Sequence, residues 1–141
     1  MQLNSYYGLA ENDYLYAKDT MYYGERAGNY NMIVSGLSHA GLMYLKAAAA
    51  KLCFPDEDIY SLLHGGNLRT MYGKIIQKFK LGVSIKDCTL LDNFNYNTRY
   101  PGTNFIEATK ADAEESLRIV EIIREDVSII LAVNNKKDES L

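Results

Sequence analysis

The chain has 141 residues, of which 48% are hydrophobic and 23% charged, and its formal net charge is −3 at pH 7. This length suits one domain with its own core, and the apolar fraction is too high for a disordered protein. No apolar run approaches the length of a membrane span, and residues 1–5 lack the basic and apolar blocks of a secretion signal, so we expect a cytoplasmic protein with no membrane association.

Apolar residues recur at helical spacing along nearly the whole chain, and no stretch alternates strictly between apolar and polar residues. A first helix is indicated by three apolar residues on one face: Tyr14, Ala17 and Met21. Asn12 or Asp13 can cap this helix, which should stop within residues 24–28 because two glycines lie there.

Residues 29–52 form a second expected helix with two apolar faces. One face carries Ile33, Leu37, Ala40, Tyr44 and Ala48, and the other carries Leu42, Leu45, Ala49 and Leu52. Such a helix belongs at the centre of a bundle. Residues 54–56 break it, and His64 then falls in a loop before Gly65 and Gly66.

A third helix is expected from Asn67 to about Gly82, and a fourth begins with the capping-box pattern of residues 84–87 and ends near Tyr96. The stretch from Arg69 to Lys86 holds five basic residues and no acidic one: Arg69, Lys74, Lys78, Lys80 and Lys86. This basic run can attract a polyanion, or it can be a solvated helix face.

The last helix begins at the capping pattern of residues 109–112 and runs for five or six turns. Four of its carboxylates are expected on the polar face: Glu114, Glu115, Glu121 and Glu125. Residues 134–141 read as a polar tail, which leaves one domain over residues 1–133. The sequence therefore predicts an all-α, up-and-down bundle of about five helices.

Between the fourth and last helices the chain reads YNTRYPG over residues 96–102. Pro101 disfavours helical backbone at Tyr100 and Gly102 can supply a positive φ, so Arg99 should lie on a rigid corner. A guanidinium held there can bind a phosphate or carboxylate through paired hydrogen bonds, or it can tie two helices together. Both interpretations stay open on the sequence alone.

The chain has two histidines, so catalysis by histidine has two candidates. We interpret His39, in the middle of the second helix, as a hydrogen-bonded core or interface residue. His64, beside the glycines, is the better candidate for a functional group, although histidines beside surface turns are usually inert. The sequence carries no metal-ligand spacing and no phosphate loop, so neither a metal nor a cofactor is expected.

Tyrosine is frequent, with 12 copies and no tryptophan, and seven of the tyrosines precede residue 31. Because each tyrosine has an apolar body and a polar tip, part of this cluster can form a dimer interface while the rest packs in the core. If the cluster forms a dimer interface, mutation of Tyr22 and Tyr23 should yield monomers.

Three stretches together resemble the HEPN family, the higher eukaryotes and prokaryotes nucleotide-binding domains. Residues 13–30 look like the family's first helix and turn, and residues 38–47 look like its second helix. The order tyrosine, arginine, tyrosine, proline in residues 96–101 is similar to the segment before its last helix. The likeness covers about residues 10 to 130.

The resemblance implies a helical bundle, often a homodimer, that binds a nucleotide or RNA or pairs with a nucleotidyltransferase partner in a toxin–antitoxin or defence system. Ribonuclease members are similar in placing a histidine after an arginine with four to six residues between the two. After Arg99 those positions hold Asn104, Phe105 and Ile106, so we expect a noncatalytic domain. In that hypothesis a groove is formed by Tyr96, Arg99 and Tyr100, with charge from Lys74 and Lys78.

Two alternatives remain from other functional classes. The first is a divergent metal-independent ribonuclease in which Arg99 stabilises the phosphate and His64 or Tyr100 moves the proton. The second is a structural adaptor whose first helix mediates dimerisation through Tyr22 and Tyr23.

Overall fold

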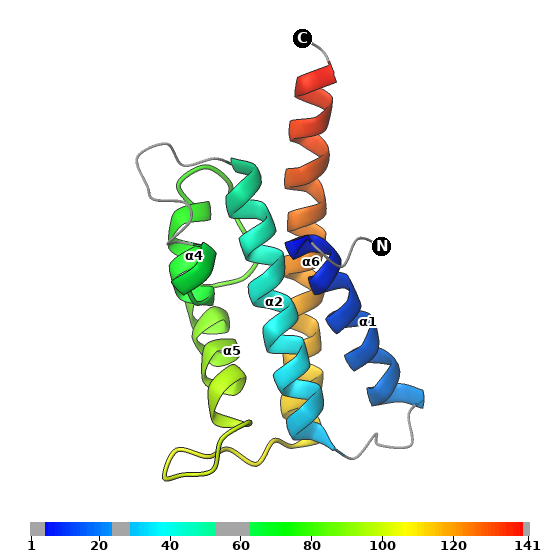
Figure 1. Ribbon diagram of the computed structural model, residues 1–141, viewed down its shortest axis with the longest axis vertical. Coiled ribbons are helices and arrows are strands. Elements are labelled where there is room, and N and C mark those ends of the chain that lie inside the picture. The colour runs from blue at the N-terminus through cyan, green and yellow to red at the C-terminus, as the bar shows by residue number, and fades with distance from the viewer. Residues whose placement is uncertain (1–4, 24–28, 53–62, 140–141) are drawn as a thin grey trace.

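The structure is a computed structural model that describes residues 5–23, 29–52 and 63–139, with side chains described as far as residue 132. Its labelled helices are α1 (Tyr6–Tyr23), α2 (Tyr30–Leu52), α4 (Leu68–Ile75), α5 (Ile85–Asn97) and α6 (Lys110–Glu139). A further helical turn covers residues 63–65. Figure 1 shows α2 in the middle of the molecule, with α4 and α5 on one side, α1 on the other and α6 behind it. The predicted all-α bundle is confirmed.

Helix α2 is the centre of the core, as its two apolar faces predict. The residues of both faces are buried except Leu52, which is half-buried. Gly41 allows the closest packing around it, because a methyl group added there would lie 3.2 Å from both Leu68 and Leu91. Helices α1, α4, α5 and α6 therefore all pack against one central helix.

Side-chain caps begin α4, α5 and α6, and the sequence predicts those of α5 and α6. The Asn67 side chain accepts a hydrogen bond from the backbone N–H of Thr70 at 2.9 Å, and Ser84 forms a capping box with Asp87. At the start of α6, the Thr109 backbone N–H donates to the Asp112 carboxylate at 2.9 Å. Because these side chains satisfy backbone donors that a helix leaves unpaired, they fix where α4, α5 and α6 begin.

Helix α1 begins earlier than predicted. The Ser5 hydroxyl accepts a hydrogen bond from the backbone N–H of Gly8 at 2.9 Å, so Ser5 caps the helix. Asn12 and Asp13, the predicted caps, lie inside the helix. The helix ends at Tyr23, and the glycines expected to stop it lie outside the described residues.

Two other boundaries also differ from the prediction. Helix α4 ends at Ile75 and not near Gly82, because the next N–H groups bond three residues back: Gln77 to Lys74 at 3.3 Å, and Lys78 to Ile75 at 2.9 Å. These tighter bonds end the α-helix in a turn. Helix α6 continues to Glu139, so residues 134–139 belong to it. The break predicted at residues 54–56 lies outside the described residues.

Within the described ranges, no helix combines the length and the apolar character needed to cross a membrane.

Candidate functional site

The loop between α5 and α6 is held against the first turn of α2 by one side chain. The Asn31 amide nitrogen donates to the backbone oxygens of Thr98, at 3.2 Å, and Ile106, at 2.9 Å. The Asn31 side-chain oxygen accepts from the backbone N–H of Ala108 at 2.7 Å. Three bonds from one amide fix both ends of the loop, and with it the position of Arg99.

Arg99 lies on the corner that the sequence predicts. Gly102 has a φ of +152°, a backbone conformation that glycine adopts far more readily than other residues. The Arg99 side chain reaches α2, where its Nε donates to the Ser35 hydroxyl and its Nη2 lies 3.4 Å from the Ser35 carbonyl oxygen. Arg99 therefore ties the loop to α2, as one of the two interpretations of this arginine proposes.

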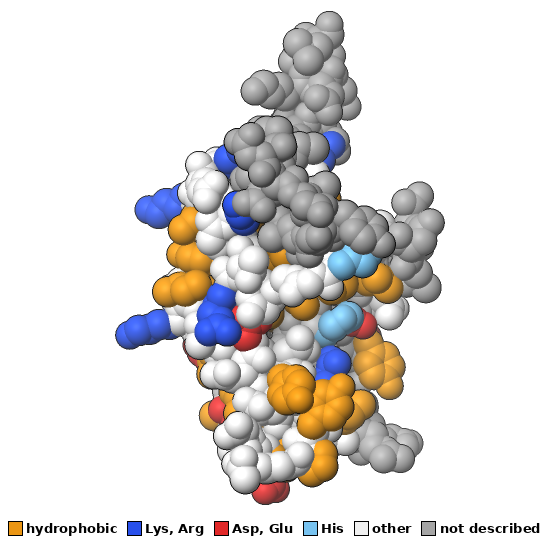
Figure 2. All heavy atoms as spheres, turned by 60° about the vertical axis from the view of Figure 1, so that its left-hand side comes forward, with side chains coloured by type: hydrophobic (Ala, Val, Ile, Leu, Met, Phe, Trp, Pro, Cys, Tyr) orange, Lys and Arg blue, Asp and Glu red, His pale blue; other side chains and the backbone are white. Residues whose placement is uncertain are grey.

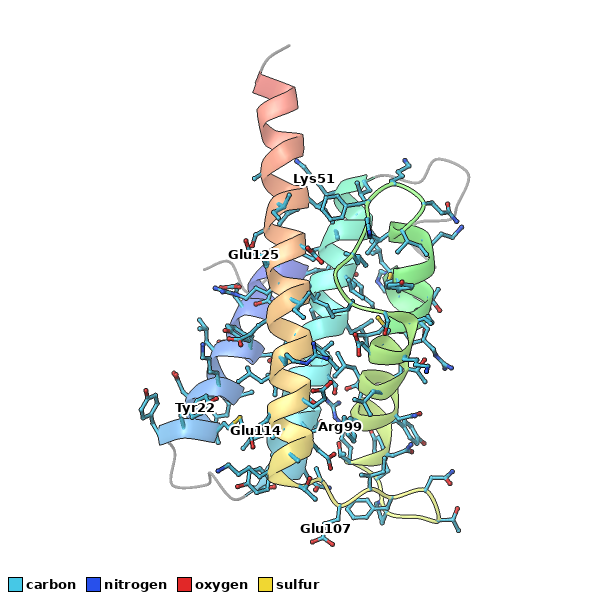
Figure 3. The ribbon with its side chains drawn as sticks, turned by 180° about the vertical axis from the view of Figure 1, so that it is seen from behind. Tyr22, Lys51, Arg99, Glu107, Glu114 and Glu125 are labelled. Atoms are coloured by element: carbon cyan, nitrogen blue, oxygen red, sulfur yellow. The ribbon has the colours of Figure 1, made fainter. Side chains whose placement is uncertain are left out.

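The Arg99 guanidinium keeps donors for another partner. A guanidinium carries five N–H donors, and Ser35 engages two of them. Arg99 is exposed, and no carboxylate of the described residues pairs with it. Figure 3 shows Arg99 near the lower end of the bundle, close to the α5–α6 loop.

One helical turn along α2 from Ser35 is an acid and histidine pair. His39 Nδ1 lies 2.6 Å from a carboxylate oxygen of Asp13 on α1. Both side chains are part-exposed, at 36% for His39 and 31% for Asp13. His39 is therefore a hydrogen-bonded histidine at the α1–α2 seam, as interpreted from the sequence, and its Nε2 atom is the ring nitrogen that Asp13 does not hold. Figure 2 shows the histidine side chains, in pale blue, on one face of the molecule.

A pocket of about 520 Å³ lies between α1, α2 and the end of α5. Its lining is Asn12, Asp13, Tyr16, Ala17, Thr20, Met32, Ile33, Ser35, Gly36, Thr98 and Arg99. Besides Arg99, the pocket has an apolar wall that includes Tyr16 and Met32. These two residues are 75% and 69% exposed, so their apolar surface is accessible to a ligand. Its size lies within the roughly 300 to 1,000 Å³ typical of small-molecule sites.

The predicted aromatic pair flanks the arginine on the outer surface. The Tyr96 and Tyr100 rings are 4.9 Å apart and tilted by 43°, and the side chains are 65% and 54% exposed. Neither tyrosine lines the pocket. Both tyrosines are thus close to Arg99 in sequence, but their rings pack on each other outside the pocket.

The structure does not bring the predicted lysines to Arg99. Lys78 Nζ donates to the backbone oxygen of Leu52, at 3.3 Å, at the far end of α2. Ser35, which holds Arg99, is 17 residues from Leu52, which corresponds to about 25 Å along a helix. Lys74 lies in the last turn of α4, near that same end. Figure 3 shows Lys51, the neighbour of Leu52, at the opposite end of the bundle from Arg99.

His64 is also placed differently from the prediction. It is exposed and lies in the helical turn of residues 63–65, not in a loop, and it does not line the pocket. The histidine on the helix that holds Arg99 is His39, which lies one turn from Ser35.

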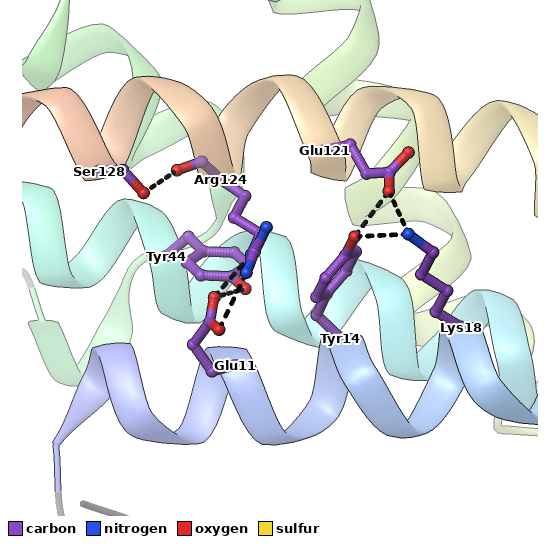
Figure 4. Close-up of polar contacts among 7 residues, drawn as sticks. All are labelled: Glu11, Tyr14, Lys18, Tyr44, Glu121, Arg124 and Ser128. Carbon is purple, nitrogen blue, oxygen red and sulfur yellow. Dashed lines mark hydrogen bonds and ion pairs between the residues drawn. The ribbon is translucent and has the colours of Figure 1, made fainter. Parts of the chain in front are cut away.

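A polar network between α1, α2 and α6 fixes the helix that forms one wall of the pocket (Figure 4). Arg124 donates to the Glu11 carboxylate at 2.7 Å, and the Tyr44 hydroxyl donates to it at 2.6 Å. Glu121 accepts from Tyr14 at 2.6 Å and from Lys18 at 3.1 Å. Glu121 therefore faces α1, while its side chain stays 41% exposed.

The network shifts the pKa values of its members. The hydrogen bond from Arg124, the largest cause, holds the pKa of Glu11 below its ordinary value. Burial alone would raise the pKa of Glu121, but the bonds from Tyr14 and Lys18 outweigh it and the pKa is lowered. Burial, and then the bond to Glu11, raises the pKa of Tyr44. Both carboxylates are therefore ionised at neutral pH, which keeps α1 attached to α6.

Among the described residues, no three histidine, cysteine or acidic side chains are grouped so that they could hold a metal ion. The site that the described side chains form is one arginine, a histidine and carboxylate pair, and an apolar pocket. Such a site can bind an anion carrying a flat or apolar group.

This fold, an all-α bundle with an arginine corner before its last helix, agrees with the outcome of the family comparison. The family model described as HEPN domain matches residues 10–130. This range covers most of the chain, which therefore belongs to the HEPN family, a nucleotide-binding and ribonuclease-type family. Searches of curated proteins and of solved structures found no match.

Proposed function

We propose that this chain is a noncatalytic HEPN domain that binds a nucleotide or RNA in the pocket beside Arg99. The observation that supports this function best is the state of Arg99: it is exposed, anchored by Ser35, and without a carboxylate partner among the described residues. An anchored guanidinium loses little freedom when it binds, so its remaining donors are preorganised for a phosphate oxygen pair.

The apolar wall of the pocket favours a nucleotide as the ligand over a simple inorganic anion. Tyr16 and Met32 present exposed apolar surface within the same pocket as Arg99. Stacking of a base on an aromatic ring contributes about 1–3 kcal/mol. A ligand with a phosphate and a base can therefore use both parts of the pocket at once.

Calorimetric titration of the purified chain with ATP and with a short RNA tests this proposal. We expect binding that weakens as salt rises and is lost or reduced about tenfold or more in Arg99→Ala, because a charge-assisted hydrogen bond is worth about 1.5–3 kcal/mol. Lys74→Ala is the matched control, since Lys74 lies at the far end of the bundle, and its affinity should change much less. Equal affinities of wild type and Arg99→Ala would contradict the proposal.

The Asp13–His39 pair supports one alternative, a metal-independent ribonuclease. His39 would replace His64 or Tyr100 as the proton acceptor, because it lies one helical turn from Ser35, which holds Arg99. The 2′-oxygen would bond to phosphorus as the P–O5′ bond breaks. His39 Nε2 would take the 2′ proton and water would return a proton to O5′, leaving a 2′,3′-cyclic phosphate.

The variant His39→Asn separates the two functions. A binding domain should keep its RNA affinity in this variant, and the wild type should leave a labelled RNA intact over long incubation. Cleavage by the wild type that yields cyclic phosphate ends, and that disappears in His39→Asn while binding remains, would establish the ribonuclease instead.

The family also supports proposals about partners. We propose a homodimer, and a nucleotidyltransferase as a possible partner protein, in a toxin–antitoxin or defence system. Exposed tyrosines at the end of α1 are consistent with an interface, because Tyr22 is 56% and Tyr23 87% exposed.

A further inference from the structure

The charges that line the Arg99 pocket restrict which nucleotide fits it. Among the described residues that line it, Arg99 is the one cation and Asp13 the one carboxylate. The nearest lysine on α1, Lys18, is 3.1 Å from Glu121 of α6 and hydrogen-bonded to Tyr14. Lys46 is 11 residues beyond Ser35 on α2, about 16 Å along the helix, and lies over the Tyr6 ring.

One guanidinium therefore faces the ligand among the described residues. A single phosphate matches this guanidinium, because two of its oxygens can accept from the N–H donors that Ser35 leaves available. A second and a third phosphate would add negative charge, and the described lining offers no further cation to receive it. They would also lie close to Asp13, which lines the same pocket and repels them.

Asp13 has a second consequence for the ligand. One of its oxygens holds His39 Nδ1 at 2.6 Å, and the other oxygen can accept a hydrogen bond. A ribose hydroxyl or a base amino group is a donor that suits this acceptor. The nucleoside part of a ligand thus gains a hydrogen bond to Asp13, whereas the negative charge of Asp13 weakens the binding of additional phosphates.

We propose that the pocket selects a nucleotide unit with a single phosphate group, either a free nucleoside monophosphate or the phosphorylated end of an RNA strand, over nucleotides with two or three phosphates. This inference rests on the proposed function, because it names the class of ligand for that same pocket. The phosphate binds Arg99, the base packs beside Tyr16 and Met32, and the sugar faces Asp13.

Competitive titrations of the full chain with adenosine, AMP and ATP, in chelator and at low salt, test this selectivity. AMP should bind more tightly than adenosine, and about three- to tenfold more tightly than ATP. In Asp13→Asn the preference for AMP over ATP should shrink. Asp19→Asn is the matched control, because Asp19 is an exposed carboxylate on the same helix that does not line the pocket, and its preference should stay as in the wild type.

A short RNA with a 5′-phosphate and the same RNA with a 5′-hydroxyl distinguish the two sources of the phosphate. Where AMP binds more tightly than ATP, tighter binding of the 5′-phosphorylated RNA than of both its 5′-hydroxyl form and AMP indicates an RNA end. Tighter binding of AMP than of either RNA indicates a free mononucleotide. ATP binding as tightly as AMP overturns this inference but leaves the proposed function standing. The absence of binding by every nucleotide and RNA overturns both.

Discussion

Asn31 is the residue on which the geometry of the arginine corner depends most. Its side chain makes three hydrogen bonds to the backbone of the α5–α6 loop. The corner at Arg99 is predictable because Pro101 and Gly102, close by in the chain, restrict the backbone. The role of Asn31 is not, since an asparagine near the start of a helix gives no local sign that it bonds residues 67 to 77 positions away.

Asn31→Ala should lower the free energy of unfolding by about 1–3 kcal/mol, because three backbone groups lose their partner. The measurement is urea unfolding followed by circular dichroism. Asn93→Ala, an exposed position on α5, is the control and should change stability little. An Asn31→Ala variant as stable as the wild type would contradict the role of this clamp.

The contributions of Ser35 and Asp13 to the site were not predicted, and His39 was predicted only as a hydrogen-bonded core or interface residue. Each lies in a helical segment, and each meets its partner through packing of α1 and the α5–α6 loop on α2. A sequence signal exists only in hindsight: Ser35 and His39 are four residues apart, so they share a helix face. By contrast, the corner at Arg99 could be predicted because the turn residues next to it are local; Tyr96 and Tyr100, predicted with it, do not line the pocket.

At the scale of helices, boundaries with a local signal were predicted and boundaries set by packing were not. The capping patterns of residues 84–87 and 109–112 each occupy four consecutive residues, and both caps are present. The start of α1 was missed because Ser5 and Asn12 are both suitable caps. Helix α1 starts at the earlier one, and the turn that this adds carries Tyr7 and Ala10, which pack in the core.

The ion pair between α1 and α6 should make stability depend on pH. The pKa of Glu11 is lowered in the folded chain, so its contribution is fully present above its ordinary pKa, about 4.3, and is lost as pH falls through the lowered value. Unfolding free energies at a series of pH values should therefore be level near neutrality and fall in acid.

The variant Glu11→Gln measures how much the ionised Glu11 carboxylate contributes to the free energy of unfolding. The variant should be less stable than the wild type by about 1–3 kcal/mol at pH 7, since it loses the charged bond to Arg124, and the gap should close in acid. Glu125→Gln, at an exposed position on α6, is the control and should follow the wild type at every pH. A gap that is independent of pH would show that the charge of Glu11 does not stabilise the fold.

Two glycines of α2 give a matched test of helix packing. A methyl group at Gly36 would lie 3.7 Å from Ala17, an ordinary contact, whereas one at Gly41 would lie 3.2 Å from two buried leucines. Gly36→Ala should raise the free energy of unfolding by about 0.5–1 kcal/mol through helix propensity. Gly41→Ala should be about 1–3 kcal/mol less stable than Gly36→Ala, because the core must make room. Urea unfolding of both variants checks the order, and the reverse order would contradict the packing around Gly41.

For the whole molecule, the main difference from the prediction is the separation of Lys74 and Lys78, in the basic run, from the arginine corner. The two features appear near each other in the chain, but α4 and α5 run along the bundle and leave Lys78 beside Leu52 at the other end. Composition can find a basic run, and it cannot say which end of a helix the run will occupy. Family membership and the all-α bundle, by contrast, follow from patterns spread over the whole chain.

The proposed homodimer predicts an effect of the two exposed tyrosines at the end of α1. Replacing Tyr22 and Tyr23 together with serine should convert dimers to monomers in size-exclusion chromatography with light scattering, because it removes apolar area at an interface. Tyr96→Ser, also highly exposed, is the control and should leave the mass unchanged, as should Arg99→Ala. A monomeric wild type would end this proposal.

The most direct test of the pocket beside Arg99 is a nuclear magnetic resonance titration of the isotope-labelled chain with AMP, following each backbone amide. We expect saturable shifts at Ala17, Gly36 and Thr98, which line the pocket, and no comparable shifts around Lys74 and Lys78. In Arg99→Ala the pocket shifts should disappear at the same ligand concentration. Shifts confined to the basic run of α4, or pocket shifts that persist in Arg99→Ala, would contradict a binding site built on Arg99.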